Sequence, residues 1–244
     1  MKKNSIRLDK FLASAGYGSR KEIKGIVRDG KVAVNGQTVK DSSVHVSPVD
    51  DTVTVDGLQV LSREFVYLML NKPAGCVSAT TDTREQTVLD FVPENYRHFE
   101  LFPVGRLDKD TEGLLLLTND GKMAHGLLAP KKHVPKTYFV KVNGPVTEVH
   151  AAKMAQGVVL DDGYLTRPAA LRVLESGDNG EAELTIYEGK FHQVKRMFKS
   201  LGMEVLYLKR IAMGGLSLDI SLQPGEVREL TPEEMGLLKN CGGY

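Results

Sequence analysis

An arginine and an aspartate, Arg106 and Asp108, stand shortly before four consecutive leucines, Leu114–Leu117, in the stretch GRLDKDTEGLLLLTNDG. The leucines predict a buried strand, so we expect the aspartate at the edge of an apolar segment. Burial raises the pKa of a carboxyl group, and such an aspartate needs a nearby cation to stay ionised. The pattern indicates either a carboxylate kept reactive against a dry wall of leucines or a charged turn that only adds solubility.

Two further polar clusters are attached to apolar segments. Lys136 and Tyr138 lie in PKTYFVKV, and Lys195 and Arg196 lie in EGKFHQVKRMF. Lys195 and Arg196 are the cations that we expect to keep Asp108 ionised, and Arg196 is also expected to bind the RNA substrate. A tyrosine beside such a site offers a flat face for stacking a base and a hydroxyl for a hydrogen bond.

Arg106 lies two residues before Asp108, so on an extended segment both side chains project to the same side. An arginine in that place can hold a displaced phosphate or fill the gap left by an extracted base. A carboxylate, a cation, a stacking ring and a backbone clamp together favour chemistry on a nucleobase taken out of its stack. Taken singly, each has an ordinary structural interpretation: turn residue, exposed helix face or half-buried strand aromatic. His192 is expected only to bond at the start of a helix, and Lys109, Asp110 and Glu112 to form a solvated turn.

The elements that must position these clusters are mostly strands. Strands do not alternate regularly with helices, so we expect an α+β domain with a mainly antiparallel sheet. Strands are predicted at residues 65–70, 113–118, 136–142, 170–174, 182–188, 203–209 and 226–230. Helices are predicted at residues 87–91, 119–128, 147–156 and 191–201.

The first 31 residues carry nine basic and three acidic side chains, whereas the whole chain has a net charge of only +1. Leu8, Phe11 and Leu12 recur at helical spacing, and Ser19 with Glu22 predicts a capping box that opens a second helix. A basic outer face on two short helices favours an anionic partner such as folded RNA over a merely solvated surface. The residues that we expect to bind RNA there are Arg7, Lys10, Arg20, Lys21, Lys24 and Arg28.

Short strands should follow these helices. Val32 and Val34 precede the turn dipeptide Asn35-Gly36, which predicts a hairpin, and VHVSPVDDTVTVDG predicts a further pair of strands. We therefore divide the chain into a small helix-plus-sheet RNA-binding domain (1–58), a linker (59–64) and a catalytic domain (65–244).

Composition excludes several classes of protein. An apolar content of 41% and a charged content of 26% are typical of a globular protein, and no apolar run reaches the length of a membrane span. Cys76 and Cys241 support neither a disulfide framework nor a zinc site, and no Gly-rich phosphate loop or metal-spaced histidine pair is present. We expect a cytoplasmic protein with no bound metal. A monomer is expected because no exposed apolar helix stripe is evident.

The head segment RLDKFLASAGYGSRKEIKGIVRDGKVAVNG resembles the RNA-binding module first described in ribosomal protein four of the small subunit. Further along, NKPAG, GRLDKDTEGLLLLTND, KTYFVKV, EGKFHQVKRMF and LKRIAMGGLSL resemble, in fixed order, the successive motifs of the pseudouridine synthases. More narrowly, the chain is similar to the RsuA branch, which modifies ribosomal RNA.

This resemblance implies a role for each matching residue. Asp108 would be the essential aspartate, acting as nucleophile or as base at the ribose–uracil linkage, and Tyr138 would stack on the target uracil. Lys195 would pair with the aspartate, Arg106 would help to hold the flipped nucleotide, and Leu208 would form an apolar floor. The leucine run would supply a water-poor wall.

The implied reaction is the isomerisation of uridine to pseudouridine in ribosomal RNA, by base flipping. Nothing is oxidised and no group is imported, so no cofactor is expected. We expect small-subunit (16S) RNA, as RNA or as a pre-ribosomal subunit, because no long basic tail follows CGGY. Three alternatives are the same reaction on large-subunit (23S) RNA, a non-catalytic assembly factor, and an RNA methyltransferase, for which no Gly-rich methyl-donor loop is visible.

Overall fold

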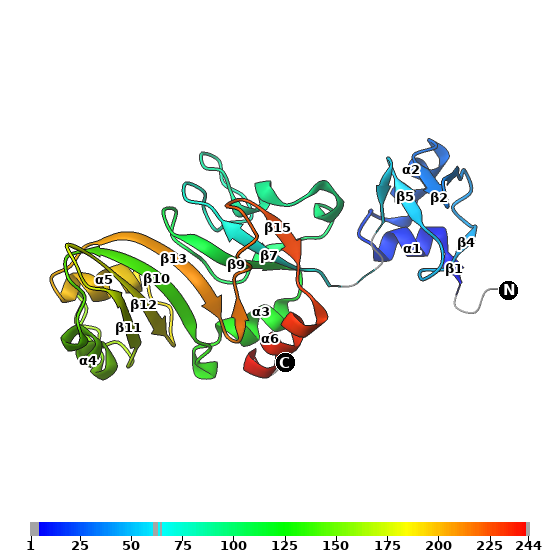
Figure 1. The fold of residues 1–244 in the computed structure, drawn as a ribbon. Helices are drawn as coiled ribbons and strands as arrows, with labels where there is room; N and C mark the ends of the chain where they lie inside the picture. The colour runs from blue at the N-terminus through cyan, green and yellow to red at the C-terminus, as the bar shows by residue number, and fades with distance from the viewer. Residues whose placement is uncertain (1–4, 61–62, 64, 243–244) are drawn as a thin grey trace. The chain divides into compact units, whose positions relative to one another are not determined.

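The computed structural model describes residues 5–60, 63 and 65–242, which divide into two compact units (Figure 1). The first unit contains the described residues up to Val66 together with Val92–Leu101, and the second contains Tyr67–Phe91 and the chain from Phe102 onward. Residues 61, 62 and 64 of the predicted linker lie outside the described residues. The domain boundaries drawn from the sequence stay a prediction.

The two basic helices of the first unit form where the sequence predicts them, as α1 (Leu8–Ser14) and α2 (Arg20–Arg28). The predicted capping box is confirmed, since Ser19 Oγ accepts from the Glu22 backbone N–H and Glu22 Oε2 accepts from that of Ser19. Their apolar stripes pack into one core and leave the basic side chains outside. The fully buried residues of this core include Leu8, Leu12, Ile23, Val27 and Val32.

Short strands complete the first unit. The predicted hairpin is confirmed as β2 (Val32–Val34) and β3 (Gln37–Thr38), with Asn35 and Gly36 both at positive φ in the turn. The second predicted strand pair is wrong as a pair. β4 (His45–Val46) bonds to β1 (Ile6–Arg7), whereas β5 (Val53–Val55) bonds to β2 and to β6 (Leu58–Gln59).

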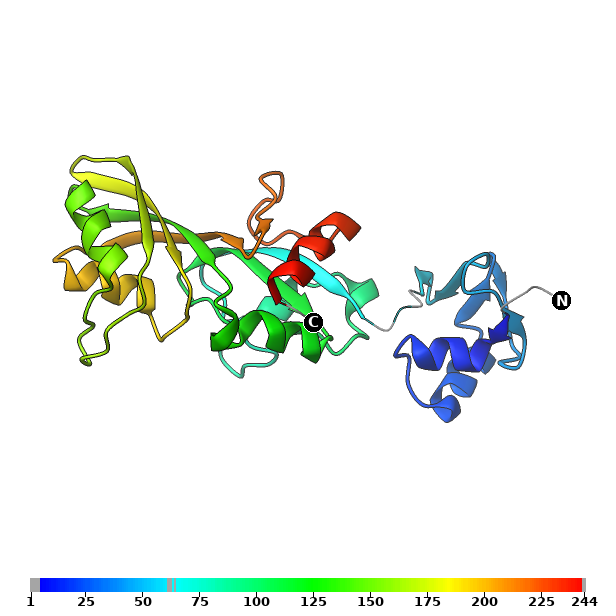
Figure 2. The ribbon, with the colours of Figure 1, turned by 90° about the horizontal axis from the view of Figure 1, so that it is seen from below.

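The second unit is built on one curved sheet (Figures 1 and 2), in the order β11-β12-β10-β13-β9-β7-β15. Its strands are β7 (Tyr67–Lys72), β8 (Phe102–Pro103), β9 (Glu112–Thr118), β10 (Lys136–Asn143), β11 (Ala170–Glu175), β12 (Asn179–Ile186), β13 (Val205–Met213), β14 (Leu216–Ser217) and β15 (Val227–Glu229). Every pairing is antiparallel except that between β9 and β13. The predicted α+β fold with a mainly antiparallel sheet is confirmed, and all seven predicted strands overlap observed ones.

Helices flank this sheet. They are α3 (Gly121–Leu128), α4 (Glu148–Gln156), α5 (Gln193–Ser200) and α6 (Pro232–Gly242), with 3-10 turns η1 (Val88–Phe91) and η3 (Pro130–Lys132). A further 3-10 turn, η2 (Glu94–Tyr96), belongs to the first unit. The predicted helix at 87–91 is only a 3-10 turn, and α6 was not predicted. In α6 the sequence does carry a start signal, because Pro232 opens the helix and two glutamates occupy its first turn. No described helix is long and apolar enough to cross a membrane.

The leucine strand lies at the centre of this fold. Leu114–Leu117 are each at most 1% exposed, because the strand is covered on both faces. Leu114 and Leu116 pack with Met123 of α3 and Met213 of β13 in the main core of the unit. The leucines therefore serve the hydrophobic core.

The parallel pairing of β9 with β13 decides which residues meet. Lys209 pairs with Glu112, and Arg210 pairs with Gly113, at the very start of β9. On the other side of β13, Arg210 pairs with Tyr138 of β10. The loop that precedes β9 is thus brought to the middle of β13 and close to Tyr138.

Candidate active site

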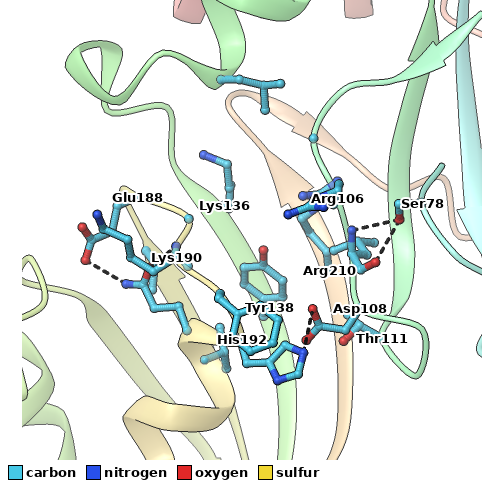
Figure 3. A pocket seen from close by; sticks show the side chains of 18 of the residues that line it. Ser78, Arg106, Asp108, Thr111, Lys136, Tyr138, Glu188, Lys190, His192 and Arg210 are labelled. Carbon is cyan, nitrogen blue, oxygen red and sulfur yellow. Dashed lines mark hydrogen bonds and ion pairs between the residues drawn. The ribbon is translucent and has the colours of Figure 1, made fainter. Parts of the chain in front are cut away.

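A pocket of about 850 Å³ opens at this junction (Figure 3). Its lining brings together five residues that the sequence analysis singled out from four separate motifs. They are Arg106, Asp108, Tyr138, Lys195 and Leu208. Figure 3 shows the side chains of Asp108, His192 and Tyr138 close together at its base.

Ser78 fixes the loop that carries Asp108. Its buried hydroxyl donates to the Leu107 carbonyl oxygen at 2.9 Å and accepts from the Leu107 backbone N–H at 3.0 Å (Figure 3). After Asp108, the chain turns so that the Thr111 N–H donates to the Asp108 carbonyl oxygen at 3.1 Å. The aspartate therefore stands on backbone that is held on both sides.

Lys72, in the NKPAG motif, also holds the loop that carries Asp108. Its ammonium is fully buried and donates to the carbonyl oxygens of Pro73, Lys109 and Thr111 at 3.0, 3.3 and 2.9 Å. Burial lowers the pKa of this lysine. Gly75 adds a backbone bond to the Lys109 carbonyl oxygen at 2.7 Å. The NKPAG motif thus holds the loop that carries Asp108 in place. This role was not predicted from the sequence.

Two cationic or potentially cationic groups face the Asp108 carboxylate. Lys195 Nζ lies 3.6 Å from Oδ2, and His192 Nε2 lies 3.6 Å from Oδ1. Lys195 lies closer to Asp110, at 2.6 Å, and although partial burial opposes the change, that bond lowers the pKa of Asp110. Lys195 is therefore shared between two carboxylates, and His192 stands next to the aspartate.

The floor of the pocket comes from adjacent strands. Tyr138 and Leu208 are 7% and 5% exposed. Arg210, which is 2% exposed, donates from Nε to the Leu114 carbonyl oxygen at 2.8 Å. Burial and the positive charge of Arg210 lower the pKa of the neighbouring Lys136 to about 8. The floor thus combines apolar surface with a buried, permanent positive charge.

The expected wall of leucines is wrong. None of Leu114–Leu117 lines the pocket, since all four side chains are enclosed in the core on the two faces of the sheet. The apolar lining comes instead from residues such as Val134, Ile186 and Leu208.

Arg196 lies apart from this pocket. It binds Asp161 and Asp162 at 2.6 and 2.7 Å, and it is not among the lining residues. Of the two cations expected near Asp108, the helix presents only Lys195 there, because successive residues on a helix point about 100° apart.

The expected solvated turn is more structured than predicted. Lys109 pairs with Glu85 at 2.7 Å, and Asp110 pairs with Lys195. Glu112 accepts a hydrogen bond from Tyr207 at 2.7 Å, and burial together with this bond raises the pKa of Tyr207.

The basic residues of the first unit are on its surface. Lys10, Arg20, Lys21, Lys24 and Arg28 are exposed. Arg7 is exposed as well, and it forms an ion pair at 2.7 Å with the buried Asp9, which lowers the pKa of Asp9.

Several further lining residues were not predicted from the sequence. The buried Glu188 and Gln193 bond to each other at 2.8 Å, and Glu188 also accepts from Tyr164 at 2.7 Å. An arginine within the mostly apolar strand VLYLKRIAM was the available signal for Arg210, because a buried charge is rare without a role. Tyr164 and Arg167 lie in no quoted motif, and only the fold brings them here. No group of three or more metal-ligating side chains was found among the described residues.

Comparison with known proteins decides the family. The profile of the family described as RNA pseudouridylate synthase matches residues 66–200, and that of the S4 domain matches residues 6–53. The chain belongs to the RNA pseudouridine synthase family. It is therefore an isomerase, and the predicted order of an S4 RNA-binding domain followed by a synthase domain of the RsuA type is confirmed.

The similarity to known pseudouridine synthases covers nearly the whole chain. An uncharacterised RNA pseudouridine synthase of Bacillus subtilis, YtzG, is 54% identical over 96% of this chain and 98% of its own length. The ribosomal small subunit pseudouridine synthase A of Haemophilus influenzae is 41% identical over 94% and 98%. The ribosomal large subunit pseudouridine synthase B of B. subtilis is 40% identical over 96% and 95%. A crystal structure of a pseudouridylate synthase superposes with a TM-score of 0.67, at 40% identity over 96% of this chain and 100% of that one.

Proposed function

We propose that this synthase isomerises a uridine of ribosomal RNA, and specifically of the small subunit, with Asp108 as its reactive carboxylate. The observation that carries the proposal is the meeting of Asp108, Lys195 and Tyr138 in one pocket from three motifs far apart in the chain. Relatives named for either ribosomal subunit support ribosomal RNA as the substrate, and those named for the small subunit are 41% to 42% identical over 98% of their length.

The pocket has the charge that an RNA substrate requires. Its lining holds seven arginines and lysines against three aspartates and glutamates. The bases are Arg106, Lys109, Lys136, Arg167, Lys190, Lys195 and Arg210. A cleft of one sign concentrates a polyanion and favours its phosphates.

Each side chain has a part in the proposed reaction. The uridine leaves its stack, its ring lies on Tyr138 and Leu208, and Arg106 holds the displaced backbone. Asp108 then acts at the ribose, as a nucleophile on C1′ or as a base on a ribose proton, with Lys195 balancing its charge and His192 beside it. The C1′–N1 bond breaks and the uracil turns in the pocket. C5 then bonds to C1′ as the bond between Asp108 and C1′ breaks or, in the base route, as the ribose proton returns. Finally C5 loses its proton and N1 gains one. Reactant and product have the same atoms, so we infer that no cofactor or metal takes part.

The enzyme's RNA targets can be read directly from ribosomal RNA. In a strain that lacks this gene, we expect one pseudouridine of 16S RNA to revert to uridine, and the wild-type gene to restore it. Chemical mapping of pseudouridine in both ribosomal RNAs measures this. Loss of a pseudouridine from 23S RNA would show that the substrate is the large-subunit RNA. If neither RNA loses a pseudouridine, the proposal is contradicted.

We further propose that the exposed basic face of α1 and α2 binds the RNA backbone. Replacing Lys21 and Lys24 with alanine should weaken RNA binding and lower the slope of log affinity against log salt by about 1.4–1.8, because each phosphate that is no longer neutralised lowers it by about 0.7–0.9. Fluorescence anisotropy at several salt concentrations measures the slope. The matched control is Lys153→Ala with Lys239→Ala, two exposed lysines outside the pocket lining. If the slope is unchanged in the variant with Lys21→Ala and Lys24→Ala, the basic face of α1 and α2 does not bind the RNA backbone.

A further inference from the structure

An exposed aromatic ring stands on the rim of the candidate active site. Phe191 is 73% exposed, although it belongs to the pocket lining. Its ring stacks on that of His192, with ring centroids 3.8 Å apart and an angle of 18° between the planes. One face of Phe191 is thus covered by His192, and the ring remains open to an external partner.

The loop that presents this ring is held from inside the unit. The buried Gln193 accepts from the Lys190 N–H at 2.8 Å and donates to the buried Glu188 at 2.8 Å. Glu188 also accepts from the Arg167 N–H at 3.0 Å, which joins the loop to another lining segment. These bonds fix Phe191 in place before any partner arrives, so little loop entropy is lost when a partner stacks on it.

His192 carries a strained backbone in support of the same geometry. Its φ is 48°, in the left-handed region that non-glycine residues rarely adopt, at the residue that precedes α5. Strain of this kind persists where the surrounding structure enforces it, and it gathers at binding and catalytic sites. Here it turns the imidazole between Asp108 and the Phe191 ring.

The surroundings of Phe191 match one class of partner. Lys190 and Lys195 lie on either side of it in the chain, and both line the pocket. Lys190 also lies over the ring of Tyr164, 4.6 Å from its centroid. An aromatic face between cations is the arrangement by which proteins bind single-stranded RNA, because bases stack on the ring while phosphates contact the cations. A lone apolar ring in so basic a rim does not resemble a protein-docking patch, which is typically larger and poor in charge.

We propose that Phe191 stacks on an unpaired nucleobase of the RNA next to the uridine that enters the pocket. This proposal rests on the function proposed above. The target uridine lies deeper, against the buried Tyr138, while its neighbour lies on the open face of Phe191. His192 connects the two positions, since it contacts the Phe191 ring and stands 3.6 Å from Asp108. Stacking tolerates any base, so Phe191 contributes affinity and position without selecting a sequence.

Removal of the ring should weaken RNA binding more than it slows the chemical step. Phe191→Ala should raise the dissociation constant for a short single-stranded RNA containing one uridine by roughly 5- to 150-fold, the range that removal of a base–aromatic stack produces. Phe191→Trp should bind at least as tightly as wild type, and Phe191→Leu should fall between. At saturating RNA, the single-turnover rate of Phe191→Ala should fall by a smaller factor than the affinity does, because the ring contacts the neighbouring base and not the reacting uridine. The control is Ile220→Ala, at a side chain 98% exposed and outside the pocket lining, which should bind as wild type does.

The stacked base can be identified by removing it. Abasic nucleotides placed one at a time beside the uridine should reduce wild-type binding at one position, and on that RNA the Phe191→Ala penalty should fall to within about twofold. A penalty that persists on every abasic RNA would overturn the proposal, as would a penalty seen only with ribosomal particles, which would indicate a protein contact. Because the readout is binding, it is independent of the proposed function. A wild-type enzyme that shows this stacking but modifies no ribosomal RNA would contradict only that function.

Discussion

Replacing Asp108 with asparagine is expected to abolish pseudouridine formation and to leave RNA binding nearly unchanged. Asparagine keeps the size and shape of the side chain but can neither attack C1′ nor accept a ribose proton, so we expect a rate loss of at least about 10³-fold. The side chain is 28% exposed and pairs only at 3.6 Å, so its neutralisation should not unfold the domain. Single-turnover assays give the rate, and anisotropy gives the affinity.

Asp110 provides the matched control for this substitution. It lies two residues away, carries the same charge and makes the shorter contact to Lys195, at 2.6 Å, yet it is 72% exposed. Asp110→Asn should stay within a few-fold of wild type. If Asp108→Asn converts uridine at the wild-type rate, or if the two variants lose equal activity, Asp108 is not the reactive carboxylate.

Local patterns in the sequence predicted the elements well. The capping box at Ser19, the Asn35-Gly36 turn and the strands of the second unit each depend on a few neighbouring residues, and all formed as predicted. Asp108, Tyr138, Lys195 and Leu208 were assembled from the order of the motifs, and the fold brings them into one pocket. Their catalytic roles stay a prediction.

The run of leucines shows what a local sequence pattern does not predict. A strand covered on both faces has no alternation to distinguish one face from the other, so four leucines say only that the strand is buried. Which layer covers each face depends on residues such as Met213, about 100 positions later in the chain. The wall of leucines was inferred because the leucines follow Asp108 closely in the sequence. In the structure their side chains are buried in the hydrophobic core and do not line the pocket.

Contacts made by backbone and by buried polar groups were equally invisible in the sequence. Ser78 and Lys72 act on the aspartate loop through carbonyl oxygens, which have no sequence identity to recognise. The parallel pairing of β9 with β13 joins residues almost a hundred positions apart, and strand register at that separation is set by packing. These long-range contacts are what turn scattered motifs into a site.

That parallel pairing is expected to fail if Gly113 becomes alanine. Gly113 has a φ of 100°, and a Cβ built there would overlap the carbonyl oxygen of Arg210 and lie 2.9 Å from its backbone nitrogen. Left-handed strain and overpacking each cost about 1–3 kcal/mol, so we expect the free energy of unfolding to fall by about 2–6 kcal/mol. Urea denaturation of the full chain measures it.

Activity should fall with stability in this variant, because separation of β13 from the start of β9 moves Asp108 away from Tyr138 and Arg210, which pair across β10 and β13. Gly121→Ala is the matched control, at the first residue of α3, where a Cβ meets no atom within 4 Å. Alanine should stabilise that position by about 0.4–1 kcal/mol, since it restricts the unfolded chain and fits a helix. A Gly113→Ala enzyme as stable and active as Gly121→Ala would show that the close approach of β9 to β13 does not hold the site together.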